Sequence, residues 1–394
     1  MATVRVRQRG KTFSYSFDAY TLDGKRKIVE KGGFSSKQIA YNEGVKAFAK
    51  YKGGDVRFSS KKINVAEFMH LWLEEKKCEL KIKTASLYAY LINGIVEIIG
   101  EKKLQELRPY DVDLMVKTFY KKGYARETIR KYLRLLKDAL NYAVYPAELI
   151  SVNVALYIKV PRNAPINIIK RKVITKEKLD TLLEAFPFSH RLHIPILLGY
   201  HTGMRLGEIL GLCWEDIDFK TKELRVERQL TYVGSVGHYF STPKTLTSYR
   251  QILLDNQIIS ILKKWKALQI KNEIKLGKNY IYNYEGKNGE LWGIPKVQEP
   301  EKDLILRKLV CTSESGAAVR RTSITNVMKK HGITFHDLRH TRATILMERN
   351  AIPKDVAVRL GHRDATITQN IYTHDTDKMK QNTVAIFEDF LKEN

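Results

Sequence analysis

The chain has 394 residues, of which 43% are hydrophobic and 28% are charged, so it has apolar material for folded cores and is too long for one small module. Lysine and arginine number 69 against 43 acidic residues, which gives a formal net charge of +26. Such a charge repels itself in a compact protein unless a polyanion offsets it. Nucleic acid is therefore the predicted partner class.

Secreted and membrane proteins are not expected classes. The first residues, MATVRVRQRGKTF, lack the apolar core of a signal peptide, and no run approaches the roughly 20 apolar residues of a membrane span. Cys78, Cys213 and Cys311 are far apart, in apolar settings, without the spacing of a zinc site or disulfide framework. We expect them to be core residues of a protein in a reducing compartment, the cytoplasm.

Residues 1–60 are predicted to form a small three-stranded sheet backed by one helix. In TVRVRQR the valines fall on one face and the arginines on the other, because strand side chains alternate. An Asp23-Gly24 hairpin turn follows the aromatic run FSYSF, and a helix at about 36–51 would cover the aromatic face. The basic face either enters a DNA groove or is a solvated edge. Its candidate DNA-binding residues are Arg5, Arg7, Arg9 and Lys25.

Residues 61–165 have helical periodicity and are predicted to form an all-helical domain. The expected helices span 64–77, 84–99, 108–122 and 125–144. The last helix should bury a stripe of Ile129, Leu133, Leu136, Leu140 and Ala143. An opposite face carries Arg126, Arg130, Arg134 and Lys137. This basic face either follows DNA phosphates or is simply solvated. After the helices, the proline-containing segment VPRNAPIN indicates a linker that ends near Ile169.

Residues 166–394 are predicted to form a mainly helical domain with a small antiparallel sheet, which makes the chain an α+β multidomain protein. Helices are expected at 176–184, 191–201 and 205–212. A three-stranded meander is expected from 222–231, 238–245 and 248–254. The polar segment 278–303 is consistent with an extra hairpin.

The first chemical motif is TGMRLGE, which places Arg205 after a Thr-Gly turn. Glu208 lies three residues on, close enough to share a helix face and orient the guanidinium. In ITFHDLRHTRATILM, a capping box formed by Thr334 and Asp337 predicts a helix start.

The same stretch carries a histidine and an arginine on one helix face, and a further motif follows it. His336 and Arg339 are three residues apart and therefore neighbours on one helix face. The stretch RLGHRDATITQNIYTH then contains His362 and, ten residues later, Tyr372.

Together these contexts resemble the tyrosine recombinase (phage-type integrase) family, most closely the integrases of conjugative transposons. The shared pattern is T-G-x-R-x-x-E, a later H-x-x-R, then L-G-H and a terminal tyrosine, in that order. The resemblance implies a site-specific recombinase that integrates and excises a mobile element through a 3′-phosphotyrosine intermediate and a Holliday junction. It implies an arm-binding domain, a core-binding domain and a catalytic domain, in that order. The implied partners are double-stranded DNA with core and arm sites, a homo-oligomer that is a tetramer on DNA, and DNA-bending accessory proteins; no cofactor, metal or membrane is implied.

The resemblance also assigns roles to residues. Arg205, Arg339 and His362 would bind the scissile phosphate, because planar guanidiniums suit its nonbridging oxygens. Tyr372 would attack, and His336 would accept the phenol proton or help to hold the phosphate. Lys244 matches the family's lysine on a β-turn and would protonate the leaving oxygen, with Lys222 and Lys271 as alternatives by position.

Other interpretations stay open at this point. His336 and His340 have the spacing of a zinc pair, but Arg339 lies between them and no third ligand is evident, so zinc is not expected. The amphipathic tail caps its own domain or, as the resemblance implies, packs on a neighbouring protomer. The competing functions are a type IB topoisomerase-like enzyme, which has the same chemistry, and a DNA-binding regulator on an inactive recombinase scaffold.

Overall fold

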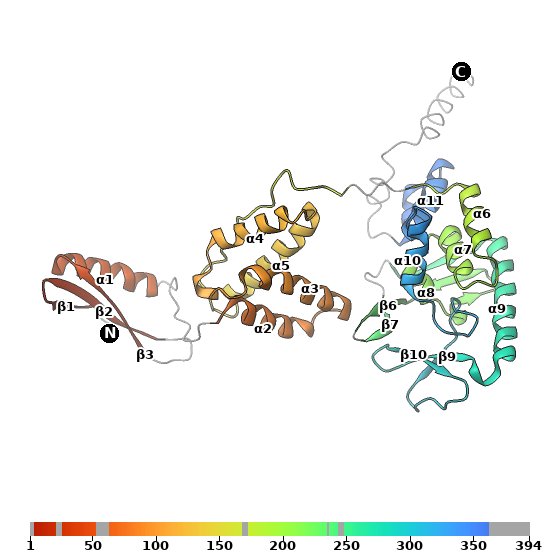
Figure 1. Cartoon of the computed structure of the whole chain (residues 1–394), viewed down its shortest axis with the longest axis horizontal. Coiled ribbons are helices and arrows are strands. Elements are labelled where there is room, and N and C mark those ends of the chain that lie inside the picture. Colours follow the sequence, from red (N-terminus) through yellow and green to blue (C-terminus); the bar gives the residue numbers. More distant parts are fainter. Residues whose placement is uncertain are drawn as a thin grey trace, which may run out of the picture. The chain divides into compact units, whose positions relative to one another are not determined.

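The computed structural model of the chain describes residues 4–20, 26–52, 63–167, 172–234, 236–242 and 248–361 (Figure 1). The chain divides into two compact units, Met1–Ile169 and Lys170–Asn394. The first holds a three-stranded sheet and a group of helices, and the second is mainly helical with small antiparallel sheets. The predicted α+β multidomain fold class is therefore confirmed.

The N-terminal sheet has the predicted strands and covering helix. They are β1 (Arg5–Arg9), β2 (Thr12–Tyr20), β3 (Arg26–Phe34) and α1 (Lys37–Lys52), with antiparallel strands in the order β1-β2-β3. Phe17 on the aromatic face is 2% exposed and packs edge-on against Phe48 of α1, with ring centroids 5.3 Å apart. A Cβ on Gly44 of α1 would lie 2.6 Å from Val4, so the helix lies directly on the sheet. The predicted Asp23-Gly24 turn lies outside the described residues.

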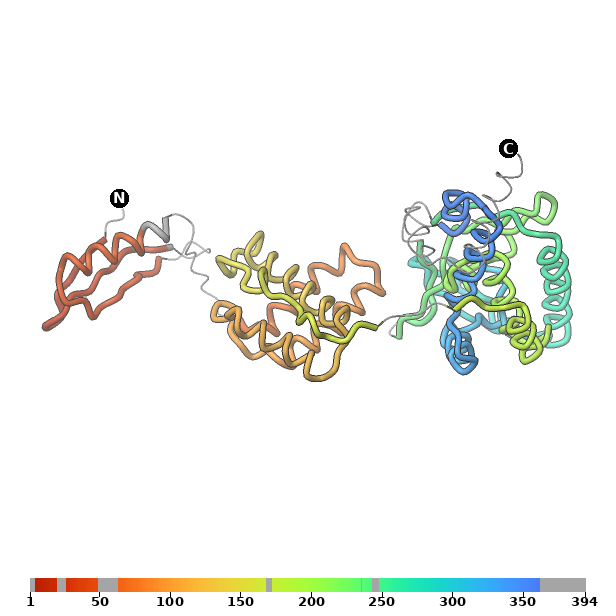
Figure 2. Tube along the Cα trace, turned by 90° about the horizontal axis from the view of Figure 1, so that it is seen from above, coloured from red at the N-terminus to blue at the C-terminus, as the bar shows by residue number. Residues whose placement is uncertain are grey.

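The four predicted helices of the helical part are present. They are α2 (Val65–Lys77), α3 (Ile82–Ile99), α4 (Pro109–Lys121) and α5 (Arg126–Val144), with a 3₁₀ turn at Leu104–Glu106 (Figure 2). The expected stripe of α5, from Ile129 to Ala143, is fully buried in their common core. The 3.6-residue period thus predicted the helices and the buried face of α5.

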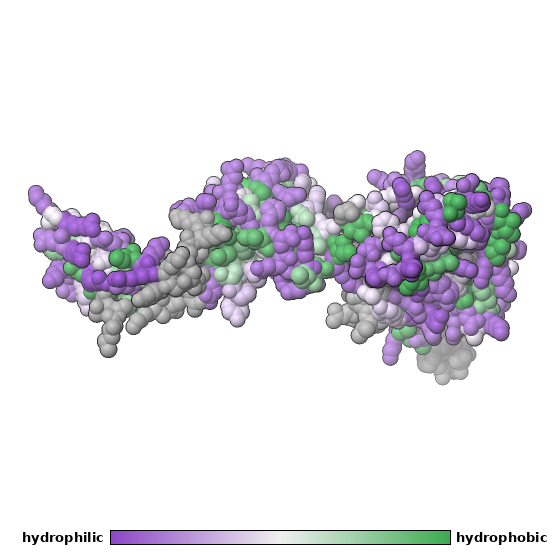
Figure 3. Space-filling model, turned by 90° about the horizontal axis from the view of Figure 1, so that it is seen from below, coloured by the Kyte–Doolittle hydropathy of each residue, from purple (hydrophilic) through white to green (hydrophobic). Residues whose placement is uncertain are grey.

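α3 departs from the expectation that no run approaches a membrane span. Within the described residues it is the one helix long and apolar enough to cross a membrane by length and composition. A core helix passes the same test, and Leu91, Ile92, Ile95 and Ile99 are buried against the other helices. Apolar side chains are also visible among the polar ones on the surface (Figure 3). The composition of α3 is therefore weak evidence for a membrane segment.

The C-terminal unit contains more helices than the sequence predicted. Its helices are α6 (Lys176–Ala185), α7 (His193–Thr202), α8 (Leu206–Leu210), α9 (Asn256–Leu276), α10 (Arg321–Lys330), α11 (Phe335–Glu348) and α12 (Pro353–Leu360). The sequence did not predict α9, α10 or α12. α7 lies between α11 and α9 (Figure 1).

The predicted three-stranded meander is wrong, because its strands belong to two sheets. β4 (Ile217–Asp218), β5 (Glu223–Val226) and β8 (Arg250–Leu253) form one sheet, whereas β6 (Gln229–Val233) and β7 (Gly237–Ser241) form a separate hairpin. A Cβ on Gly211, just after α8, would lie 2.7 Å from the backbone nitrogen of Leu230, so β6 packs closely on that turn. Alternation identifies strands but not their partners.

The extra hairpin in the polar segment is present. β9 (Ile281–Glu285) pairs with β10 (Leu291–Pro295), and β11 (Ile305–Arg307) adds a third antiparallel strand.

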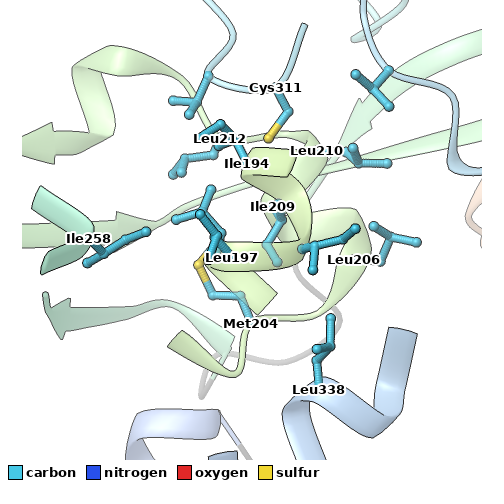
Figure 4. Close-up of a cluster of buried hydrophobic side chains, with 14 of the residues drawn as sticks. Ile194, Leu197, Met204, Leu206, Ile209, Leu210, Leu212, Ile258, Cys311 and Leu338 are labelled. Carbon is cyan, nitrogen blue, oxygen red and sulfur yellow. The ribbon is translucent and has the colours of Figure 1, made fainter. Parts of the chain in front are cut away.

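The core of the C-terminal unit surrounds α7 and α8. Figure 4 shows Ile194 and Leu197 of α7 close to Ile209 of α8, with Leu338 of α11 approaching from another side. Cys213 and Cys311 are buried here as expected. The same expectation for Cys78 is wrong, because this residue follows the polar end of α2 and is exposed.

Candidate active site

A left-handed glycine connects α7 to the first arginine motif. Gly203 has φ +69° and caps α7, and a Cβ there would lie 2.6 Å from Cδ2 of Leu360 at the end of α12. An L side chain is disfavoured at this position by both its backbone angle and the lack of space. Met204 is then buried, and the side chain of Arg205 remains 39% exposed.

Glu208 holds Arg205 through two hydrogen bonds. Its Oε2 accepts from the backbone N–H of Arg205 at 2.9 Å, and its Oε1 accepts from Arg205 Nη1 at 2.8 Å. The side chain of Glu208 is only 3% exposed. Burial raises the pKa of Glu208, but Arg250 and Arg205 together lower the pKa by more, so it lies below its usual range. The carboxylate is therefore charged at neutral pH.

Arg250 of β8 completes this group, and the sequence analysis missed it. Its Nη2 donates to Glu208 Oε2 at 2.9 Å, and its Nε donates to the backbone oxygen of Arg359 at 2.8 Å. Its Nη1 donates to the backbone oxygen of Ser248 at 3.1 Å, and the side chain is 4% exposed. Strand alternation could have indicated that Arg250 faces the core, because it lies two residues before the buried Ile252 and so shares its strand face.

The second arginine motif meets the first at Gly203. Thr334 and Asp337 cap α11 as predicted, with the Thr334 N–H donating to Asp337 Oδ2 at 2.6 Å. Arg339, 3% exposed, donates from Nη1 to the backbone oxygen of Gly203 at 2.8 Å. His336 lies exposed in the first turn of the same helix.

The end of α12 joins the same place. Gly361 caps this helix with φ +70°, and its backbone oxygen accepts a hydrogen bond from Arg205 Nη2 at 2.9 Å. Gly361 directly precedes His362 in the L-G-H motif. The structure thus brings together Arg205, Glu208, Arg339 and the residue before His362, whereas Lys244, His362 and Tyr372 lie outside the described residues.

Positive charge exceeds negative charge around these motifs. Arg342 and Arg359, which the sequence analysis also missed, each have a buried Nε without a hydrogen-bond partner in the described part of the chain. Burial and then the neighbouring Arg342 lower the pKa of Arg359. Among the acidic groups of the described structure, Asp255 has its pKa lowered partly by Arg342, and Glu208 has its pKa lowered by Arg250 and Arg205. A cationic cluster of this kind suits a bound anion.

Comparison with known proteins identifies the family of the chain. The profile of the phage integrase family matches residues 172–379, and that of the phage integrase N-terminal SAM-like domain matches residues 64–120.

The chain belongs to the phage integrase family.

Individual relatives agree with this membership. A tyrosine recombinase XerC-like protein of Caldanaerobacter subterraneus subsp. tengcongensis is 30% identical to this integrase over 349 residues, 83% of each chain. The transposase from transposon Tn916 of Enterococcus faecalis is 25% identical over 282 residues, covering 71% of this chain and 66% of the transposase. The protein is therefore a tyrosine-type site-specific recombinase that acts on DNA.

Two solved structures share the fold of this integrase. The Tn1549 transposon integrase in complex with circular intermediate DNA has a TM-score of 0.62 at 18% identity, covering 82% of this chain and 100% of that one. A lambda integrase tetramer bound to a Holliday junction has a TM-score of 0.54 at 17% identity, covering 93% and 96%.

The N-terminal sheet of the integrase presents the three predicted arginines on one exposed face, away from α1. Two of them contact acidic residues on the other two strands: Arg5 pairs with Asp18 of β2, and Arg9 Nη2 lies 3.0 Å from Glu30 Oε1 of β3. Within the described residues Arg7 makes no ion pair, and it is exposed. Lys25 lies outside the described residues.

The predicted basic face of α5 is only partly free of contacts. Arg130 pairs with Glu127 at 3.0 Å, and Arg134 is exposed. Arg126 is half-buried, and its backbone N–H donates to the backbone oxygen of Pro165. Within the described residues, no group of three or more His, Cys, Asp or Glu side chains is placed to hold a metal ion.

Proposed function

We propose that Arg205, Arg339 and His362 bind the scissile phosphate of DNA and that Tyr372 attacks it. The observation that carries this proposal is the convergence of Arg205 and Arg339 on the Gly203 turn, with Gly361 hydrogen-bonded to Arg205. Two of the five N–H groups of Arg205 donate to Glu208 and Gly361, which leaves three for a ligand.

The proposed chemistry follows from the charge of a phosphodiester. Negative charge on the nonbridging oxygens repels a nucleophile, and it is stabilised in the transition state by fixed guanidiniums. Attack by the Tyr372 oxygen forms a 3′-phosphotyrosyl bond and releases a 5′-hydroxyl. His336 accepts the phenol proton, and Lys244 gives a proton to the leaving 5′ oxygen.

Strand rejoining is the reverse reaction with another strand end. A 5′-hydroxyl attacks the phosphotyrosine and releases the phenol, whose ordinary pKa is about 10. Because the bond energy stays in the phosphotyrosine, rejoining needs no nucleotide cofactor. Removing either arginine should cost about 3 kcal/mol of transition-state stabilisation, or roughly 10²-fold in rate.

The remaining parts of the chain are proposed to hold DNA. Residues 1–60 bind arm sites through Arg5, Arg7, Arg9 and Lys25, residues 61–165 bind the core site through α5, and residues 166–394 catalyse. The net charge of +26 and the exposed arginines support this division. The active form is proposed to be a homo-tetramer on DNA in the cytoplasm, joined through its tail segments and assisted by DNA-bending proteins.

A suicide-substrate assay tests the proposed nucleophile. Purified protein is mixed with nicked duplexes from the ends of the mobile element in the presence of EDTA, and covalent protein-DNA bands are read on a denaturing gel. Tyr372→Phe should bind DNA and form no covalent band, whereas Tyr232→Phe, a change at an exposed tyrosine of β6, should react normally. A covalent band from Tyr372→Phe would assign the attack to another residue. DNA binding without any band from the unaltered protein would favour an inactive regulator.

A further inference from the structure

From one buried position, Arg250 contacts two distant parts of the catalytic unit and the backbone just before its own strand. Its guanidinium donates to Glu208 near the start of α8, to the backbone of Arg359 in α12, and to the backbone of Ser248. Glu208 in turn holds Arg205, and Arg359 lies two residues before Gly361, which accepts from Arg205. Arg205 is thus held from two sides, and both supports lead back to Arg250.

We propose that Arg250 is a positioning residue for Arg205 in DNA strand cleavage. It fixes the Glu208 carboxylate that orients Arg205, and it fixes the end of α12 that provides the second acceptor for Arg205. This inference rests on the proposed role of Arg205 as a ligand of the scissile phosphate.

The geometry requires arginine rather than lysine. Three different nitrogens of Arg250 donate in three directions, at 2.8, 2.9 and 3.1 Å. A lysine ammonium carries its donors on one nitrogen and cannot span these three acceptors from a single position. Arg250→Lys should therefore keep the buried charge and lose some of the three contacts.

The charges of Glu208, Arg205 and Arg250 favour binding of a phosphodiester. One carboxylate, Glu208, is shared by two guanidiniums, so the group of Glu208, Arg205 and Arg250 has an excess of one positive charge. The side chain of Arg250 is 4% exposed and that of Arg205 is 39% exposed, so the excess can reach a ligand only through Arg205. A phosphodiester bound at Arg205 supplies the missing negative charge.

The test compares two substrates that differ at the scissile position. One carries the normal phosphodiester, and the other carries a neutral methylphosphonate, in which a methyl group replaces one nonbridging oxygen. A guanidinium contributes less to cleavage of the neutral group, because it has less negative charge to stabilise. A substitution that removes or misplaces the Arg205 guanidinium should therefore slow cleavage of the methylphosphonate less than cleavage of the phosphodiester.

Arg250→Lys and Arg250→Gln are compared with Arg205→Lys, with strand cleavage measured on denaturing gels and folding checked by thermal unfolding. Arg228→Lys is the matched control, because Arg228 also forms a largely buried pair, with Asp216 at 2.7 Å. If Arg250→Gln does not fold, Arg250→Lys still gives the comparison, since it retains the charge.

We expect Arg250→Lys to slow cleavage of the phosphodiester by about 10-fold or more, and the methylphosphonate by about threefold or less, in parallel with Arg205→Lys. If Arg228→Lys slows cleavage, the fold-change should be equal on both substrates. The proposal is overturned if Arg250→Lys is equally impaired on both substrates, or impaired on neither, while Arg205→Lys shows the difference. If Arg205→Lys is equally impaired on both substrates, the proposed role of Arg205 as a phosphate ligand is wrong. That result is distinct from a failure of the Arg250 proposal.

Discussion

Glu208 Oε2 accepts a hydrogen bond from Arg250 Nη2 at 2.9 Å, although the two residues are 42 positions apart in the chain. The other oxygen of the same carboxylate accepts from Arg205. Since one buried anion serves two cations, the conformation of Arg205 depends on a residue outside its own sequence motif.

Replacing Glu208 should affect both stability and catalysis. Glu208→Gln keeps the shape of the side chain but removes the carboxylate charge that two guanidiniums share, so we expect the catalytic unit to lose about 3 kcal/mol of unfolding free energy. Cleavage measured below the melting temperature should fall at least 10-fold, because Arg205 is less well oriented. Glu285→Gln is the control, because it neutralises a β9 carboxylate that accepts from Arg307 of β11, and it should leave cleavage unchanged. Normal cleavage by Glu208→Gln would contradict the orienting role.

Gly203 should not tolerate a side chain. Gly203→Ala places a Cβ in a left-handed conformation, at a cost of about 1–2 kcal/mol, and 2.6 Å from Leu360. Gly332→Ala is the control, since Gly332 has the same φ of +69° and its nearest neighbour would be Lys172 Nζ at 3.9 Å. Urea unfolding should show a larger loss for Gly203→Ala than for Gly332→Ala. Equal losses would mean that the end of α12 moves aside easily.

Arg7 should contribute to DNA binding without supporting the fold. Arg7→Ala is expected to weaken binding of a duplex carrying arm sites and to reduce the slope of log affinity against log salt by about 0.9, the value for one phosphate contact. Thermal unfolding should not change, because the side chain is exposed and makes no ion pair within the described residues. Binding to a duplex with only the core site is the internal control. An unchanged salt dependence on arm DNA would favour the solvated-edge interpretation of this sheet face.

His238 should make stability depend on pH. Burial, and then Arg320, lower its pKa in the folded protein, and its buried Nε2 has no hydrogen-bond partner in the described structure. The unfolded chain keeps the ordinary pKa of about 6.5, so it binds more protons than the folded state just below that pH. The contribution of His238 to stability is therefore complete above about pH 6.5 and is lost as the pH falls below it. In urea unfolding between about pH 5 and 8, His238→Gln should reduce this dependence, and an unchanged pH profile would be the contrary result.

The sequence predicted those features that depend on local spacing. Glu208 lies three residues after Arg205 and Asp337 three after Thr334, and both pairs form the contacts expected of neighbours on a helix. The apolar stripe of α5 predicted its buried face for the same reason.

Features that depend on distant partners were missed. Alternation showed that 248–254 is a strand, but not that β8 pairs with β5 and carries Arg250 to Glu208. The meeting of Arg339 with Gly203 needs α11 to pack on α7, which no one-dimensional pattern specifies. The same limit produced the wrong meander.

Locating the covalent bond to DNA tests the proposed nucleophile most directly. The unaltered integrase is trapped on a suicide substrate in EDTA, the adduct is digested with nuclease and trypsin, and the nucleotide-linked peptide is identified by mass spectrometry. The proposed mechanism places the linkage on the peptide spanning 364–378, whose one tyrosine is Tyr372, with a bond to the 3′ phosphate of the cleaved strand. A linkage to any other residue, or to a 5′ phosphate, would contradict it.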